Sequence, residues 1–297
     1  MKKRELLEIY REFLPDRVNK LESGMEKIPD ELGTSGVWKI LEEPLNKWEK
    51  NRKSLRTLPV VNVYNNVLDE KLSNSVVESL LCLDAWIGSM DDEIDTKNIS
   101  KRDKIFNICN TAFSGGIGIL NLPEGEKEGL RNLFFEYLTE LFQIPNVEKK
   151  TLLAIKEAKS DVREVKFVRS FYSYRSIDID LFAKIPGIVN DIDDKVFGTV
   201  VNDLEVFRAR ELILKDIVDV ERDLKDEDFT ALMVLMDKYD DFDKVIGEVE
   251  DVLNYFSYSD FSRGKYRKVL KKLEENKDYE RDLEKGFNLV KKKGFEL

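Results

Sequence analysis

Apolar residues recur at three- and four-residue spacing along most of this chain of 297 residues, a pattern typical of helices with one buried face. We expect helices over 2–14, 36–49, 72–95, 101–120, 126–143, 147–183, 196–225, 228–237, 242–256 and 264–293. Segments with proline, glycine and small polar residues, such as "KIPDELGTSG" and "LNLPEGE", separate them. The one candidate strand, "LPVVNVYNN" at 58–66, is short. The pattern therefore predicts an all-α fold.

Neither a low-complexity linker nor a fixed-period repeat divides the sequence, so we expect a single domain over 1–297, a bundle of roughly ten helices. No window approaches the length of a membrane-spanning apolar helix, and the N-terminal residues lack the apolar core of a signal peptide. Cys82 and Cys109 lie in apolar helical stretches, where reduced thiols are expected. These features favour a cytoplasmic protein with no integral membrane segment.

Composition narrows the chemistry further. The net charge of −10 argues against a broad nucleic-acid surface. The chain contains no histidine, which removes the usual general base and the usual zinc ligand. Any metal would be held by oxygen ligands, which favours magnesium or calcium.

A first cluster of aspartates, "SMDDEIDTK" at 89–97, follows the apolar run "VVESLLCLDAWIG". Asp91 and Asp95 are four residues apart and project from one helix face, and Asp92 lies beside them. Acids at a helix C-terminus oppose the helix dipole, an arrangement poor for stability. Asp84, earlier on roughly the same face, is either solvated or a late proton acceptor.

A second cluster, Asp216, Asp219 and Asp223, lies in "KDIVDVERDLKDEDFTALMVL" and repeats this spacing. Like charges at such spacing cost roughly 0.2–0.5 kcal/mol per pair, so the arrangement invites a compensating cation. In so acidic a chain each cluster alone also fits solvated surface charge. Their occurrence on two long helices favours a magnesium site.

These motifs resemble those of class I isoprenoid synthases, the superfamily of terpene cyclases, trans-prenyltransferases and squalene/phytoene synthases. "DDEID" is similar to their first aspartate-rich motif. The second stretch resembles the cyclase motif N/D-D-x-x-S/T-x-x-x-E. On this resemblance Lys215, Asp216, Asp219 and Asp223 occupy the motif positions, and Arg222 is the basic neighbour of the final acid.

Lys215 departs from the family pattern, because it occupies the position of the first metal ligand and a charged lysine does not ligate magnesium. Three arrangements stay open. Asp216 replaces it as a ligand after a small rotation of the helix, one metal is held differently, or Lys215 contacts diphosphate and a metal site is lost.

The resemblance implies further diphosphate contacts. Arg175 corresponds to the diphosphate-sensing arginine, with Asp178 as its linker, and Arg169 is the alternative sensor. Arg263 and Tyr266 resemble the Arg-Tyr pair that closes over the diphosphate in cyclases.

An apolar, aromatic cavity would keep a carbocation dry. Its expected lining is Trp86, Ile87, Phe171, Tyr172 and Asp178, although core packing is the ordinary role of such apolar and aromatic side chains.

The resemblance thus implies an isoprenoid-synthase bundle around a central apolar cavity, with three Mg²⁺ ions that clamp the diphosphate of an allylic prenyl diphosphate. The expected metal ligands are Asp91, Asp92, Asp95, Asp216, Asp219 and Asp223. The expected reaction is that of a terpene synthase, a carbon–oxygen lyase that ionises the substrate and releases diphosphate. No basic segment like the "GGKxxRP" of trans-prenyltransferases is present, which favours a single substrate over chain elongation. A prenyl-coupling enzyme of the trans-prenyltransferase or squalene/phytoene type, and an inactive helical partner or lipid-binding protein, are the alternatives. A homodimer is left open.

Overall fold

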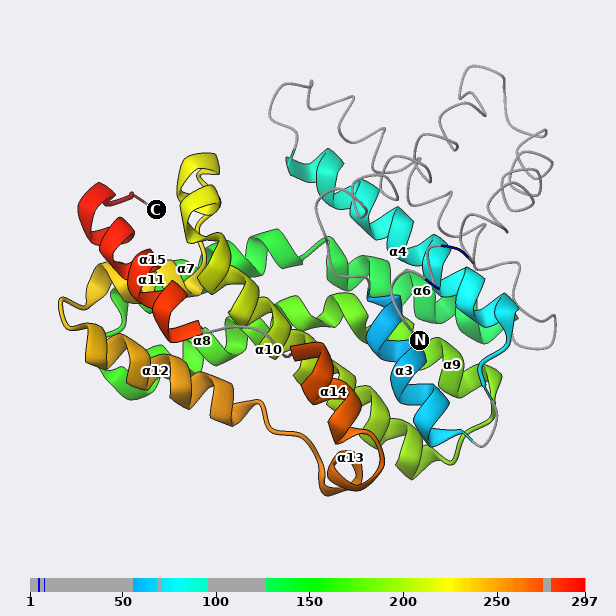
Figure 1. Ribbon diagram of the computed structural model, residues 1–297. Helices are drawn as coiled ribbons and strands as arrows, with labels where there is room; N and C mark the ends of the chain where they lie inside the picture. The colour runs from blue at the N-terminus through cyan, green and yellow to red at the C-terminus, as the bar shows by residue number, and fades with distance from the viewer. Residues whose placement is uncertain are drawn as a thin grey trace, which may run out of the picture. The chain divides into compact units, whose positions relative to one another are not determined.

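The computed structural model describes residues 56–68, 71–95, 127–274 and 279–296, together with Glu5 and Glu8. Every regular element among these residues is a helix (Figure 1), so the prediction of an all-α fold is confirmed for them. The chain divides into two compact units, Met1–Leu138 with Leu181–Asp193, and Thr139–Asp180 with Asp194–Leu297. None of the described helices is both long and apolar enough to cross a membrane. The predicted helices at 36–49 and 101–120 lie outside the described residues, and of the one at 2–14 only Glu5 and Glu8 are described, both of them helical.

The first unit contains α3 (Thr57–Val67), α4 (Asn74–Asp95), most of α6 (Lys127–Leu141) and most of α9 (Asp180–Val189). Helix α3 packs against α4, and the hydroxyl of Tyr64 on α3 donates a hydrogen bond to the carbonyl of Ala183 on α9. The side chains at the centre of this unit are fully buried, namely Val60, Val61, Val63, Tyr64, Leu80, Leu81, Phe182 and Ile185.

The short candidate strand at 58–66 is helical in the structure, in line with the predicted all-α fold. Its buried residues Val60, Val61, Val63 and Tyr64 follow a helical spacing, whereas a strand with one buried face would bury every second residue. Pro59 falls in the first turn of α3, where the missing N–H has no intrahelical acceptor. Burial of this face overrides the strand preference of the valines.

The second unit is built around the 33-residue helix α10 (Asp194–Asp226), which is about 50 Å long at the rise of an α-helix. Around it lie α7 (Ile144–Glu157), α8 (Asp161–Arg175), the 3₁₀ segment η3 (Ser176–Ile179), α11 (Ala231–Lys238), α12 (Phe242–Tyr255), α13 (Asp260–Lys265), α14 (Arg267–Glu274) and α15 (Tyr279–Lys293). Helix α10 contacts α8, η3, α11, α13 and α15 (Figure 1).

Helices predicted over 72–95, 126–143, 196–225, 228–237 and 242–256 are confirmed as α4, α6, α10, α11 and α12. The continuous helices expected over 147–183 and 264–293 are wrong, because α7, α8, η3 and α9 divide the first and α13, α14 and α15 occupy the second. Helix α7 ends where the ammonium group of Lys238 reaches the carbonyls of Ile155 and Ala158, at 3.2 and 2.8 Å. This contact from α11 supplies donors to carbonyls that a continued helix would have satisfied internally.

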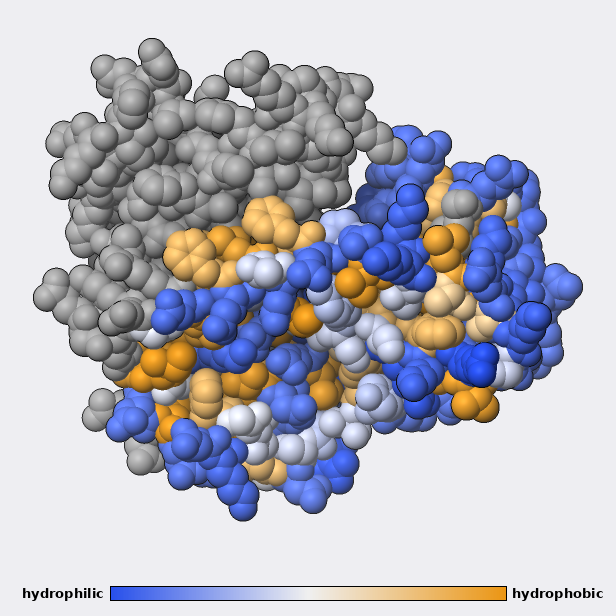
Figure 2. Space-filling view, turned by 180° about the vertical axis from the view of Figure 1, so that it is seen from behind, coloured by the Kyte–Doolittle hydropathy of each residue, from blue (hydrophilic) through white to orange (hydrophobic). Residues whose placement is uncertain are grey.

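The surface of the described residues contains both hydrophilic and apolar areas. On the face drawn in Figure 2, hydrophilic residues surround several separate apolar patches. Single exposed apolar side chains, such as Val162, are ordinary on a folded protein.

Candidate functional site

Three aspartates lie along one face of α10. Asp216, Asp219 and Asp223 are separated by three and four residues on an unbroken helix, so the spacing predicted from the sequence is confirmed. Their surroundings differ, because Asp216 and Asp223 are buried and Asp219 is partly exposed. Lys215, the residue that departs from the family pattern, is exposed.

Asp216 is held by two side chains of α8. One oxygen of its carboxylate accepts hydrogen bonds from a terminal nitrogen of Arg175 at 2.7 Å and from the hydroxyl of Tyr172 at 3.0 Å. The Nε of Arg175 pairs with Glu148 of α7 at 2.9 Å, so three helices meet at this network. Burial raises the pKa of Asp216, and the charges of Arg175 and Lys215 oppose that rise. Both contacts engage the same oxygen of Asp216, which is thereby already paired with a cation.

Asp219 and Asp223 share a different partner, Arg222 of the same helix. A terminal nitrogen of Arg222 lies 3.0 Å from Asp219 and 2.7 Å from Asp223, and its Nε donates to the same oxygen of Asp223 at 3.0 Å. The Asp223 side chain is 4% exposed, that of Asp219 22% and that of Arg222 54%. Burial raises the pKa of Asp223 to about 6. Two carboxylates, one turn apart, thus share one arginine, which reaches solvent and compensates only part of their negative charge.

These two carboxylates fit part of a magnesium site. Magnesium commonly takes one or two carboxylates and completes its shell with water and phosphate oxygens. Among the residues that the structure describes, no group of three or more acidic or cysteine side chains is arranged to hold a metal by itself. Asp219 and Asp223 therefore suit a metal that arrives with a phosphate ligand better than an all-protein cage.

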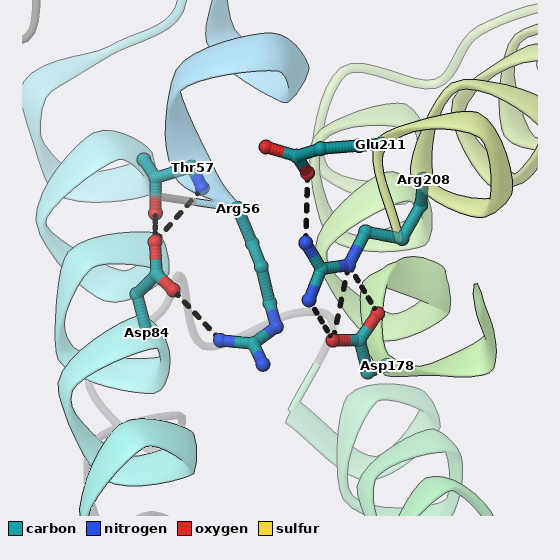
Figure 3. A network of polar contacts seen from close by, with 6 residues as sticks. All are labelled: Arg56, Thr57, Asp84, Asp178, Arg208 and Glu211. Atoms are coloured by element: carbon teal, nitrogen blue, oxygen red, sulfur yellow. Dashed lines mark hydrogen bonds and ion pairs between the residues drawn. The ribbon is translucent and has the colours of Figure 1, made fainter. Parts of the chain in front are cut away.

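The segment proposed as sensor and linker lies where the helical path changes. Helix α8 ends at Arg175, and the 3₁₀ segment η3 carries Asp178. The Nε–H of Arg208 is shared between the two carboxylate oxygens of Asp178, at 2.8 and 3.1 Å, and a terminal nitrogen of Arg208 donates to Asp178 at 2.6 Å (Figure 3). Arg208 also pairs with Glu211 at 2.7 Å. Asp178 thus fixes η3 to α10, a role that the sequence did not suggest.

Of the two candidate sensors, Arg175 is the one that contacts the second motif. Arg169 lies elsewhere on α8, where it donates to the carbonyl of Asp251 at 3.2 Å and stacks over the ring of Tyr255 at 4.7 Å. Its position on the packing surface between α8 and α12 does not bring it to the aspartates of α10.

The two residues of the expected Arg-Tyr pair, Arg263 and Tyr266, each contact an aspartate outside the second cluster. Tyr266 is buried, and its hydroxyl donates to Asp203 at 2.7 Å. Arg263 is 53% exposed and pairs with Asp260 on its own helix at 3.2 Å. Tyr266 therefore secures α13 to α10 in this structure.

Those side chains expected to line a cavity that the structure describes are buried. Phe171 and Tyr172 belong to the core of the second unit, with their ring centroids 5.2 Å apart in an edge-to-face arrangement. Ile87 is buried in the first unit, and the side chain of Trp86 lies outside the described part of the chain. The central apolar cavity stays a prediction.

The first cluster is described only as backbone. Asp91, Asp92 and Asp95 lie in the last turns of α4, and their side chains are outside the described residues. Asp84, earlier on α4, is fully buried, so the alternative of a solvated residue is wrong. It accepts hydrogen bonds from the backbone N–H of Thr57 at 2.9 Å and its hydroxyl at 3.0 Å (Figure 3). Asp84 thereby caps the start of α3.

Sequence reasoning missed Glu148 as the second partner of Arg175 and Tyr172 as a hydrogen-bond donor to Asp216. The periodicity of α10 identifies which acids share a face, but it does not identify their partners on α7 and α8. In comparisons with known proteins, no family model, no curated protein and no solved structure matches the chain.

Proposed function

We propose that the chain is a magnesium-dependent enzyme of the terpene-synthase type, which ionises an allylic prenyl diphosphate and releases diphosphate. The observation that carries the proposal is the pair Asp219 and Asp223, one turn apart on α10, which share a single partly exposed partner, Arg222. An anion-bearing substrate can take over this arginine and leave two hard oxygen ligands for a metal. The proposal includes an isoprenoid-synthase type of fold around an apolar cavity, and a cytoplasmic location.

Bound magnesium would stabilise the negative charge that develops on the leaving diphosphate. Asp219 and Asp223 would hold the metal, and the sequence predicts further ligands at Asp91 and Asp95. Arg222 and Lys215 are exposed cations on the helix that carries the metal ligands, and they would contact the diphosphate oxygens. Departure of a diphosphate needs no protein base, so the absence of histidine from the chain is compatible with this chemistry.

One observation favours a second candidate, an inactive helical protein that binds a lipid or a partner. Lys215 stands at the first ligand position, and Asp216, its nearest substitute, is already paired with Arg175 and Tyr172. A metal site with only two of its three helix ligands can retain binding without turnover.

Incubation of the purified protein with Mg²⁺ and prenyl diphosphates of increasing length, with and without isopentenyl diphosphate, tests the proposal. We expect diphosphate release and a hydrocarbon or alcohol product without isopentenyl diphosphate. An elongated or coupled diphosphate would instead indicate a prenyl-coupling enzyme. Absence of release from every substrate would reject the enzymatic proposal and favour the second candidate.

Two variants test the residues. Asp223→Asn and Asp91→Ala should each reduce turnover by at least about a hundredfold, since each removes a charge from the proposed metal site. The matched control is Glu280→Gln with Glu284→Gln, because these exposed carboxylates have the same four-residue spacing on α15. Retained turnover in both site variants would remove the metal assignment.

A further inference from the structure

Arg222 contacts one oxygen of each of the two carboxylates of the proposed metal site. One oxygen of Asp223 accepts two N–H groups of Arg222, at 2.7 and 3.0 Å, and an oxygen of Asp219 lies 3.0 Å from the same guanidinium. The guanidinium of Arg222 therefore repels any second cation that approaches the two carboxylates. The arginine and a metal therefore compete for one place.

Of the three side chains, that of Arg222 is the one that can rotate away from the carboxylates. Asp223 is almost fully buried on α10, whereas 54% of the Arg222 side chain is exposed. Exposed arginine side chains change rotamer on a fast timescale, while a buried aspartate on a packed helix is fixed. Displacement would thus move Arg222 outward and leave the carboxylates in place.

A second copy of the same local sequence shows that the contacts between the arginine and the aspartate depend on the surroundings. The tetrapeptide "ERDL" occurs at 221–224 and again at 280–283, at the start of α15. There the Nε of Arg281 is 3.8 Å from Asp282, whose side chain is 25% exposed. The closer contacts of Arg222 accompany a more deeply buried aspartate and a second carboxylate one turn earlier.

We propose that Arg222 is a built-in counterion that keeps metal alone out of the site and makes binding of the metal and of a diphosphate cooperative. This inference rests on the proposed function of the same site. A diphosphate offers Arg222 another anion, and withdrawal of the guanidinium frees Asp219 and Asp223 for the metal. Because coupling between two ligands is reciprocal, metal would strengthen diphosphate binding by the same factor.

Binding of Mn²⁺, followed by electron paramagnetic resonance at buffered free metal with and without inorganic pyrophosphate, tests the inference. For the wild-type chain we expect weak binding of Mn²⁺ alone and a roughly tenfold or greater enhancement by pyrophosphate. Arg222→Gln should bind Mn²⁺ alone several-fold more tightly and show a smaller enhancement. Arg222→Lys, which keeps the charge but loses the forked donors, should lie between them.

Arg281→Gln is the matched control, since it removes an exposed arginine from the same tetrapeptide, and its Mn²⁺ binding should equal that of the wild type. Circular dichroism verifies that each variant is folded. Equal or weaker binding of Mn²⁺ alone by Arg222→Gln than by the wild type overturns the inference and leaves the proposed function standing. No binding of Mn²⁺ by wild type or variant, with or without pyrophosphate, overturns both. Tighter binding by Arg222→Gln in a chain that turns over no prenyl diphosphate supports the inference and rejects the proposed activity.

Discussion

At the scale of single residues, three aspartates of one helix have been given different roles by what surrounds them. Asp216 is buried against Arg175 and Tyr172, whereas Asp219 and Asp223 meet the partly exposed Arg222. A buried charge is tolerated only when it is paired and hydrogen-bonded, so the first of these acids is a structural element of the packing between helices. Asp219 and Asp223 instead pair with Arg222, which is exposed enough for solvent to replace it.

Asp216→Asn should lower the free energy of unfolding by about 3 kcal/mol, because it leaves the guanidinium of Arg175 with one counterion fewer. This loss is at the low end of the range for removing one partner of a buried ion pair, because Arg175 retains Glu148 and its side chain is 20% exposed. Urea unfolding measures the difference. Asp243→Asn, an exposed change on α12, should stay within about 0.5 kcal/mol of the wild type. Equal losses in the two variants would show that the Asp216 network is not stabilising.

The raised pKa of Asp223 predicts a distinctive pH dependence of the free energy of unfolding. Its pKa is raised from 3.8 to about 6 by burial, so its protonated form stabilises the folded state below pH 4 and this stability is lost as the pH rises through 6. A shift of this size corresponds to about 3 kcal/mol of unfolding free energy between pH 4 and pH 7. In metal-free buffer with chelator, Asp223→Asn should remove that fall, and Asp243→Asn should retain it. The same pH slope in the wild type and in Asp223→Asn would contradict the assignment.

The spacing of these acids could be predicted from the sequence, but their partners could not. A helical period places Asp219 and Asp223 on one face whatever lies opposite them. The contact between Asp216 and Arg175 depends on how α8 packs against α10, which no local pattern determines. For the same reason Arg169 and Arg175 were equivalent candidates in the sequence and are distinguished only by the fold.

At the scale of elements, buried aspartates on long helices tie neighbouring segments in place. Asp84 of α4 caps α3 through Thr57, and Asp203 of α10 accepts from the backbone N–H of Ser259 at 2.8 Å, at the start of α13. Each supplies an acceptor to an N-terminal region whose N–H groups lack an intrahelical partner. Both acids look anomalous in an apolar helical pattern, and both are explained by a cap that comes from another element.

Removal of Asp203 should therefore loosen one element. Asp203→Ala leaves the backbone N–H and hydroxyl of Ser259 and the hydroxyl of Tyr266 without their acceptor, at a cost of about 3 kcal/mol. We expect faster hydrogen exchange in α13 and α14, with α12 less affected. Asp260→Ala, whose side chain is almost fully exposed, should cost only a few tenths of a kcal/mol by comparison. Unchanged exchange in α13 after Asp203→Ala would refute the capping role.

Long amphipathic stretches gave reliable helices, while their interruptions were harder to predict. Helix α10 lies within two residues of its expected range because its pattern is long and unbroken. The breaks that end α7 and form η3 depend on Lys238 and Arg208, which come from other helices. The valines of α3 make 58–66 the one strand candidate in the sequence, and the packing of its buried face favours the helix instead.

At the scale of the whole molecule, Asp219 and Asp223 of the candidate site lie in the unit built around α10, and occupancy of the site should stabilise the chain. A ligand that binds only the folded state adds about 2.7 kcal/mol at a hundred times its dissociation constant. We expect Mg²⁺ and inorganic pyrophosphate together to raise the melting temperature by several degrees, and chelator to reverse the shift. Neither ligand alone should match this effect, because Arg222 opposes metal binding until an anion engages it.

The double variant Asp219→Asn with Asp223→Asn should lose the stabilisation, and Glu280→Gln with Glu284→Gln should keep it, since both pairs remove two carboxylates at the same spacing. Calorimetry at fixed pH and ionic strength makes the comparison, because net charge changes equally in the two variants. A full shift retained without Asp219 and Asp223 would place the ligands elsewhere on the chain. A shift produced by pyrophosphate in the presence of chelator would indicate a simple anion site, for which the exposed cations Lys215 and Arg222 would suffice.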